Sequence, residues 1–446
     1  MTMNMLDKAI AILLLAALVF TVLAHGAVEP WSIALFEFAA LGLILLWGIK
    51  AAAAGRFQIR VSQAALAFAA LVAIGLIQSV AFGDGSGRIS TLSFDVEATR
   101  SSVLALSCLL ICFLVASNFF VTRDRLRALA HFLVIFGFCM AVFGLVQHFA
   151  WNGRFYWLRT NHYGASPFGP FVNHNHFAGF MDLLMPVPAA LVITRGVRGE
   201  TRLFYGFAAA IMGIATIASL SRGGIVSLLG GLVFLAVMGS RLKGAGAVAA
   251  VAGVIAIGVL WVGLDPVVNR IAGQADKGGE TFFTSRGWLW RDTASLIQAN
   301  PILGVGMGAF QTAYPIYSKS DGALQVGQAH NDYLQVLADF GVAGMAAAAW
   351  FIVSIGRAFR FGIKSRDRLL AGLALGGGAG IFAMLVHSLF DFNLQIPSNA
   401  LLFLLLTAVV SHIGGSVATA RAERGQEQPL NHSVDRSRRL SGVSIG

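Results

Sequence analysis

Long apolar runs, separated by charged or Gly/Pro-rich breaks, are the main pattern along this chain. A helix needs roughly 17 to 25 mostly apolar residues to cross a bilayer. Twelve runs approach this length, at 9–24, 31–49, 62–82, 102–121, 128–150, 174–194, 203–220, 224–239, 245–264, 333–355, 369–390 and 398–412. The pattern predicts an all-α, polytopic integral membrane protein with about twelve transmembrane helices.

The composition agrees with a membrane location. Of the 446 residues, 57% are hydrophobic and only 12% are charged, whereas about 25% of the residues of a soluble globular protein are charged. A soluble fold of this size is therefore excluded. The three cysteines, Cys108, Cys112 and Cys139, lie within apolar runs, so we expect buried thiols and no disulfide framework.

Basic residues are distributed unevenly between the two ends of the predicted helices. The chain has 32 Lys and Arg against 21 Asp and Glu, a net charge of +11. About two thirds of these basic residues share the side of the N-terminus, at 8, 50–60, 123–127, 195–202, 241–243, 357–368 and in the tail. Cytoplasmic loops carry such an excess, so both termini are expected to be cytoplasmic, with the first run retained as a helix. Topology explains the charge, and no nucleic-acid partner is expected.

One outer segment, 265–332, is far longer than a connector requires, and loops of that length are usually functional or folded. Within it, a helical pattern follows Thr284 and is ended by Asn300 and Pro301. Arg286 lies near one face of that helix, and Arg291 points elsewhere. The alternating glycines at 304–308 follow no strand, so they favour close backbone packing over a nucleotide site.

His330 and Arg222 are the candidates for chemistry. His330 directly precedes an apolar helix, where an imidazole can meet an aqueous acceptor and a lipid-linked donor. Arg222 follows Ser221, which can cap the next helix, and the free amides of that helix would then face the same space as the guanidinium. This arrangement favours an anion site, although an arginine that only reaches for the headgroups is the alternative.

Two further outer segments are candidates for the same site. Asp95 stands in a polar stretch before the fourth predicted span, and residues 173–176 read Asn-His-Asn-His. This cluster lacks the partners and the spacing of a zinc motif, so no metal is expected. Within the spans, Glu37 and Asp182 are acidic, and pairing with a neighbouring helix is as consistent with them as a transport role.

Several motifs, taken in order, resemble the O-antigen ligase and polymerase superfamily of bacterial membrane glycosyltransferases. His330-Asn331 is followed after nine residues by Gly341 and after two more by Gly344. The turn at 221–223, Arg286 before Trp290, the stretch 300–308 and the segment 387–392 before Pro397 stand in the matching order. The resemblance covers about 207–400.

This resemblance implies an inverting transfer on the periplasmic face, from an undecaprenyl-diphosphate-linked glycan to an acceptor hydroxyl. His330 would act as general base, and Arg222 and Arg286 would hold the departing diphosphate. Guanidinium groups suit phosphate oxygens and can replace a metal, so no cofactor is expected. Candidates for supporting roles are Arg291, Asn331, Asp332, Asp391 and Asp95.

The resemblance also implies three parts and a cell location. Residues 1–206 would be amino-terminal transmembrane helices, 207–417 the ligase-related membrane domain with the periplasmic loop 265–332, and 418–446 a disordered cytoplasmic tail. The protein would lie in the bacterial inner membrane, with the lipid bilayer as its surroundings.

The acceptor stays open at this stage. A ligase would transfer the glycan to lipid A core, and a polymerase would transfer it to a growing glycan. A polysaccharide or lipid transporter predicts opposed repeats and polar residues at the bilayer midplane instead. A non-catalytic scaffold would leave the long outer loop unexplained.

Overall fold

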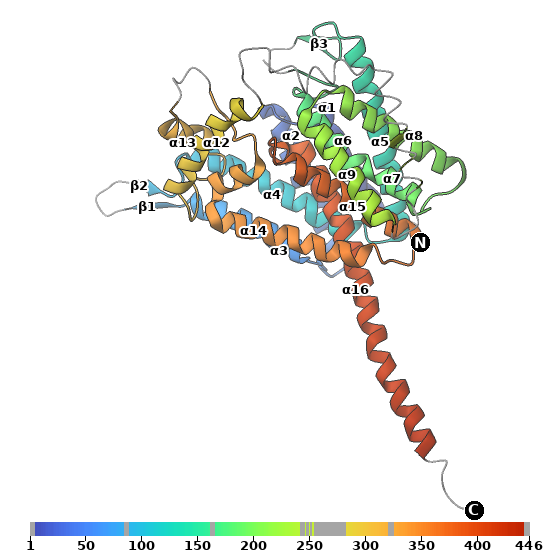
Figure 1. Cartoon of the computed structure of the whole chain (residues 1–446). Helices are drawn as coiled ribbons and strands as arrows, with labels where there is room; N and C mark the ends of the chain where they lie inside the picture. Colours follow the sequence, from blue (N-terminus) through green and yellow to red (C-terminus); the bar gives the residue numbers. More distant parts are fainter. Residues whose placement is uncertain are drawn as a thin grey trace, which may run out of the picture.

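Helices dominate the computed structural model, which describes residues 5–83, 89–160, 166–240, 282–319 and 325–440, and also positions 246, 249, 252 and 253 (Figure 1). The helices are α1 (Met5–Leu23), α2 (Pro30–Ala53), α3 (Gln63–Gln78), α4 (Val96–Phe119), α5 (Arg123–Phe149), α6 (His174–Leu184), α7 (Pro186–Ile193), α8 (Gly199–Ala218), α9 (Arg222–Ser240), α12 (Phe282–Ala299), α13 (Phe310–Tyr317), α14 (Asp332–Gly362), α15 (Arg368–His387), η1 (Asn393–Gln395) and α16 (Pro397–Leu440). Two short antiparallel pairs join β1 (Ala81–Gly83) to β2 (Ile89–Thr91) and β3 (Arg154–Phe155) to β4 (Arg159–Thr160).

The predicted membrane spans agree closely with these helices. In the described part of the chain, ten helical segments are long and apolar enough to cross a membrane, and each coincides with a predicted span. The predicted span 62–82 forms the shorter apolar helix α3, of 16 residues. The predicted span 245–264 lies almost entirely outside the described residues. The chain is therefore an all-α, multi-pass membrane protein, as the hydropathy pattern predicts.

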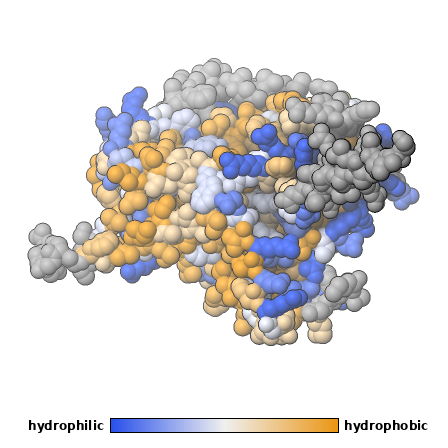
Figure 2. All heavy atoms as spheres, turned by 90° about the horizontal axis from the view of Figure 1, so that it is seen from below, coloured by the Kyte–Doolittle hydropathy of each residue, from blue (hydrophilic) through white to orange (hydrophobic). Residues whose placement is uncertain are grey.

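Apolar side chains cover much of the face seen in Figure 2. On α2, Phe38 is 68% exposed and Leu45 is 64% exposed, which suits contact with lipid hydrocarbon better than contact with water. Cys139 is also exposed, whereas Cys108 and Cys112 are buried. The prediction of three buried thiols is wrong for Cys139, because an apolar run does not reveal which face of a helix turns outward.

Ion pairs join several of the predicted cytoplasmic loops at one end of the helices. Asp7 accepts from Lys50 and from Arg125, each at 2.5 Å, and Arg123 pairs with Asp367. These loops therefore lie at one end of the helices, where Asp7 and Asp367 join the basic residues after α2, before α5 and before α15. The loop before α15 joins the last residue of α14 to the first residue of α15. The first residue of α14 and the last residue of α15 therefore lie at the opposite ends of these two helices.

α14 is interrupted near its start by Gly341, whose φ of 62° and ψ of −159° are not helical. The segment that follows α12 pairs with the backbone on both sides of this break. Val342 donates its amide to the carbonyl of Pro301 at 2.8 Å, and Val305 donates to the carbonyl of Ala338 at 2.8 Å. The close backbone packing predicted from the alternating glycines at 304–308 is confirmed, and it holds the first turns of α14 in place.

The long outer segment contains two helices with a small apolar core of their own. α12 ends at Ala299, directly before the predicted stop at Asn300. Side chains of α12, α13 and the segment between them bury one another, among them Leu289, Leu296, Val305 and Phe310. α12 and α13 lie near the β1–β2 hairpin (Figure 1). Parts of the predicted loop, 265–281 and 320–324, lie outside the described residues.

α16 projects far beyond the other helices (Figure 1). Its polar composition from Arg421 onward predicts disorder, yet the backbone remains helical to Leu440. Ala, Arg, Glu and Gln are good helix formers, so local propensity continues the last membrane helix although this stretch offers few apolar residues to bury.

Candidate functional site

The start of α14 presents His330 on a tightly held turn. Asn331 caps the helix, since its side-chain oxygen accepts from the amides of Tyr333 at 2.9 Å and Leu334 at 3.1 Å. His330 stands before this cap with a positive φ of 49°. The indole of Trp290 on α12 donates to the carbonyl of Ala329 at 3.1 Å. The turn is thereby fixed from both sides, and the cap is Asn331 instead of His330.

The imidazole of His330 contacts a carboxylate from a distant part of the chain. Its Nδ1 lies 3.1 Å from Oδ1 of Asp391, and the side chain of His330 is 35% exposed while that of Asp391 is 2% exposed. The other carboxylate oxygen of Asp391 accepts from the Asn175 amide at 2.5 Å. The ring of Phe392 meets the His330 ring edge-on, with centroids 4.8 Å apart.

Asp391 is held in its ionised form. Burial alone would raise its pKa, but the hydrogen bond with His330, the imidazole of His176 and the guanidinium of Arg286 together hold the pKa well below its usual range. An ionised carboxylate only accepts, so His330 donates to it from Nδ1. A neutral imidazole in this tautomer leaves the Nε2 lone pair available to accept a proton.

Two arginines from different helices converge beside this pair. Arg222 begins α9, where Ser221 caps the helix by accepting from the Gly224 amide at 3.1 Å. Arg286 on α12 donates to the carbonyl of Phe390. Burial lowers the pKa of Arg286, Asp391 raises it and the nearby Arg222 lowers it, so all three charged groups share one electrostatic environment. Two neighbouring guanidinium groups, which stay charged at neutral pH, favour an anion between them.

The other predicted supporting residues make different contacts. Asp332 is buried and accepts from the Ser388 hydroxyl at 2.7 Å, which ties the start of α14 to the end of α15. Arg291 is exposed on another face of α12. Asp95 caps α4 by accepting from Ala98 at 3.0 Å and accepts from Thr312 of α13 at 2.9 Å. The structure therefore brings together His330, Asp391 and the two arginines, but neither Arg291 nor Asp95.

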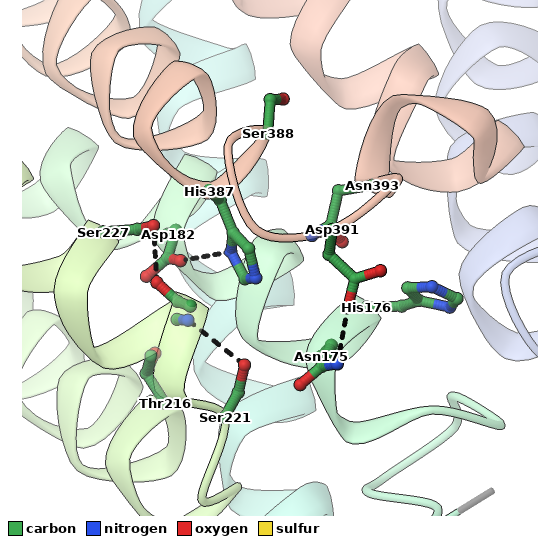
Figure 3. A network of polar contacts seen from close by, with 12 residues as sticks. Asn175, His176, Asp182, Thr216, Ser221, Ser227, His387, Ser388, Asp391 and Asn393 are labelled. Carbon is green, nitrogen blue, oxygen red and sulfur yellow. Dashed lines mark hydrogen bonds and ion pairs between the residues drawn. The ribbon is translucent and has the colours of Figure 1, made fainter. Parts of the chain in front are cut away.

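The sequence does not indicate that Asn175, Asp182 and His387 belong to this site (Figure 3). Asn175 was considered only as part of a polar cluster, and its contact with Asp391 spans 216 positions of the chain. Asp182 pairs with His387, the neighbouring-helix alternative that its position left open, with Oδ2 and Nδ1 2.9 Å apart. Within the described residues, no group of three or more His, Cys, Asp and Glu side chains is suited to hold a metal ion.

A large cavity of about 870 Å³ lies beside the site. Its lining comes mainly from α2, α3, α4, α14 and α16 and is largely apolar, and among the residues that the structure describes it contains no Lys or Arg. Phe392 connects the two regions, since it lines the cavity and also contacts His330. The carboxyl-bearing side chains in the lining are Glu37, Asp332 and Asp339. The cavity suits hydrocarbon, and Arg222 and Arg286 lie outside its lining.

Comparison with known proteins supports the resemblance found in the sequence. Residues 207–349 match the family model described as O-antigen ligase. The matched region contains Arg222, Arg286 and His330, whereas Asp391 lies beyond it. A search of curated proteins finds no match to the chain. The match confirms the resemblance to this superfamily over residues 207–349, about a third of the chain.

Proposed function

Because this chain is a multi-pass membrane protein with an O-antigen ligase domain at residues 207–349, we propose that it transfers a glycan from undecaprenyl diphosphate to an acceptor hydroxyl. The family model supports a membrane enzyme of the ligase and polymerase group, with a lipid-linked glycan as partner. The observation that carries the proposal for this chain is the convergence of the His330–Asp391 pair with Arg222 and Arg286.

In the proposed reaction, Nε2 of His330 accepts the proton of the acceptor hydroxyl. The hydroxyl oxygen then bonds to the anomeric carbon of the donor sugar from the face opposite the diphosphate, and the configuration inverts. Asp391 holds the imidazole through Nδ1 and stabilises the imidazolium that forms, as a carboxylate does in other Asp–His pairs. Asn175 fixes the orientation of the Asp391 carboxylate.

The bond between the anomeric carbon and the diphosphate oxygen breaks in the same step, and its electron pair stays on the diphosphate. Arg222 and Arg286 bind this leaving group and neutralise its charge, which is the role that a metal ion takes in other enzymes. The capped amino end of α9 adds backbone amides beside Arg222. The proposed mechanism therefore requires no metal.

The cavity supports a lipid as the substrate that enters beside His330. About 870 Å³ accommodates on the order of thirty groups the size of a water molecule, at about 30 Å³ each. The described lining, which has no Lys or Arg, receives hydrocarbon, while the diphosphate stays with the two arginines. The basic loops at the opposite end of the helices support a periplasmic position of this site.

A purified assay tests this function and separates ligase from polymerase. The protein is reconstituted with undecaprenyl-diphosphate-linked glycan, either alone or with lipid A core, and the products are identified by mass. A ligase yields glycosylated lipid A core, and a polymerase yields a longer lipid-linked glycan from the donor alone. Turnover in EDTA is expected to equal that without it. Failure to form either product, or a His330→Ala variant as active as the wild type, would contradict the proposal.

A further inference from the structure

Asp182 and His387 form a hydrogen-bonded pair that the proposed reaction does not use (Figure 3). Asp182 belongs to α6 and His387 is the last residue of α15, and their side chains are 0% and 1% exposed. Burying such a pair costs desolvation free energy, and apolar side chains of similar volume fill space at lower cost. What the pair adds is orientation, since the hydrogen bond at 2.9 Å fixes the plane of the imidazole.

The far edge of the His387 ring packs against the turn that carries Arg222. A Cβ atom placed on Gly223 would lie 3.0 Å from both Cδ2 and Nε2 of His387 and 3.2 Å from Cβ of Phe390. The ring therefore rests on the backbone of the residue that follows Arg222, where a side chain would push it away. From the next turn of α9, the hydroxyl of Ser227 donates to the Gly223 carbonyl at 2.7 Å.

The backbone of His387 holds the other half of the site. Its carbonyl accepts from the amide of Phe390 at 2.8 Å and from that of Asp391 at 3.1 Å. The carbonyl of Phe390 receives the Arg286 guanidinium, and Asp391 contacts His330. A shift of His387 would thus move the Phe390 carbonyl that orients Arg286, whereas Asp391 is also held by Asn175.

α6 spaces these contacts along one face. Asn175 and Asp182 are seven residues apart, about two helical turns, so they share a side of the helix. Asn175 holds Asp391, and Asp182 holds His387, four positions earlier in the chain. One rigid helix therefore sets the distance between Asp391, which contacts the proposed base His330, and His387, which packs against the turn that carries Arg222.

We propose that the Asp182–His387 pair is a positioning element that keeps Arg222 and Arg286 aligned to bind the diphosphate of the donor. This inference rests on the proposed function. Since the pair acts through the arginines, its loss weakens binding of the donor and leaves the base intact. The expected change is a rise in donor KM of about ten- to a hundredfold, the effect of a misplacement near 1 Å, with acceptor KM unchanged.

The test compares three variants with one control. Asp182→Ala removes the hydrogen bond, Gly223→Ala pushes the His387 ring from the Arg222 turn, and both are expected to raise donor KM. Asp182→Asn keeps an acceptor for Nδ1 and should restore donor KM to within about threefold. The control is Tyr205→Phe, which removes a different buried contact between two membrane helices, Tyr205 to His131 at 2.6 Å, and should leave donor KM unchanged.

Direct binding separates this inference from the proposed function. Stabilisation of each protein against thermal unfolding is measured with added undecaprenyl diphosphate. If the wild type shows no stabilisation, the proposed function fails. If the wild type binds and Asp182→Ala binds equally well, or loses only kcat, the pair is merely structural and the inference fails. Should Asp182→Ala not fold, an unchanged donor KM in Gly223→Ala overturns the inference in the same way.

Discussion

At the scale of single residues, His330→Asn separates the proposed base from the backbone that carries it. His330 has a φ of 49°, a conformation that Asn adopts more readily than most residues. The fold and the donor site should therefore persist, while the amide cannot accept a proton. We expect turnover to fall by about 10² to 10⁴, measured beside the thermal stabilisation by undecaprenyl diphosphate. Wild-type turnover in this variant would remove His330 from the mechanism.

Lysine substitutions at Arg222 and Arg286 test the binding of the diphosphate. Arg222→Lys and Arg286→Lys keep the positive charge but lose the planar fork that binds a diphosphate at two points. We expect kcat/KM for the donor to fall by roughly ten- to a thousandfold for each variant. Arg291→Lys is the matched control, since Arg291 is exposed on the same helix α12 and should tolerate the change. Equal activity of all three variants would show that the guanidinium geometry is unimportant.

At the scale of elements, the break in α14 depends on one glycine. Gly341 combines φ 62° with ψ −159°, a region that residues with a side chain occupy at a cost of about 1 to 3 kcal/mol. A Cβ there would also crowd the backbone of Ile302 and Leu303. Gly341→Ala should therefore lower the melting temperature and the activity together, because the turn with His330 is attached to this short first part of α14.

Gly356 in the same helix provides the control for this prediction. A Cβ at Gly356 meets no atom of the described residues within 4 Å, and alanine improves helix propensity by about 0.5 to 1 kcal/mol. Gly356→Ala should therefore melt at the same or a higher temperature in detergent. If Gly341→Ala behaves like Gly356→Ala, the break in α14 contributes nothing to stability.

At the scale of the whole molecule, filling the cavity should block the lipid substrate without harming the fold. Ala348 lines the cavity, and the adjacent Ala349 is exposed on the other side of α14. Ala348→Phe would exclude several methylene groups, each contributing about 0.8 kcal/mol, so turnover should fall by about tenfold or more. Ala349→Phe should keep turnover. Equal activity of the two variants at equal melting temperature would place the lipid outside the cavity.

The orientation in the membrane gives the last prediction. Arg291 on α12 and Arg360 near the end of α14 are both exposed. In a Cys139→Ala background, an impermeant thiol reagent added to intact cells should label Arg291→Cys, and should label Arg360→Cys only after lysis. The reverse pattern would place the candidate site in the cytoplasm and refute the periplasmic reaction.

The sequence by itself determined the class of fold, the membrane spans and the order of the motifs. Apolar runs encode length along a helix, and length decides whether a helix crosses a bilayer. Local rules also located the cap at Ser221 and the end of α12 before Asn300, because caps and prolines act over a few residues. The exposure of Cys139 and the helical tail after Arg421 were beyond these rules.

Only the tertiary structure decided which polar groups meet. Asp391 was one of several candidates, and its contacts with His330 and Asn175 join positions 61 and 216 residues away. Arg291 and Asp95 were also candidates for supporting roles, yet Arg291 is exposed on another face of α12 and Asp95 caps α4 and contacts Thr312. The residues of the His387–Asp182 pair are 205 positions apart, and the periodicity of the sequence does not reveal their contact. A contact between helices depends on how the helices pack and not on spacing along the chain.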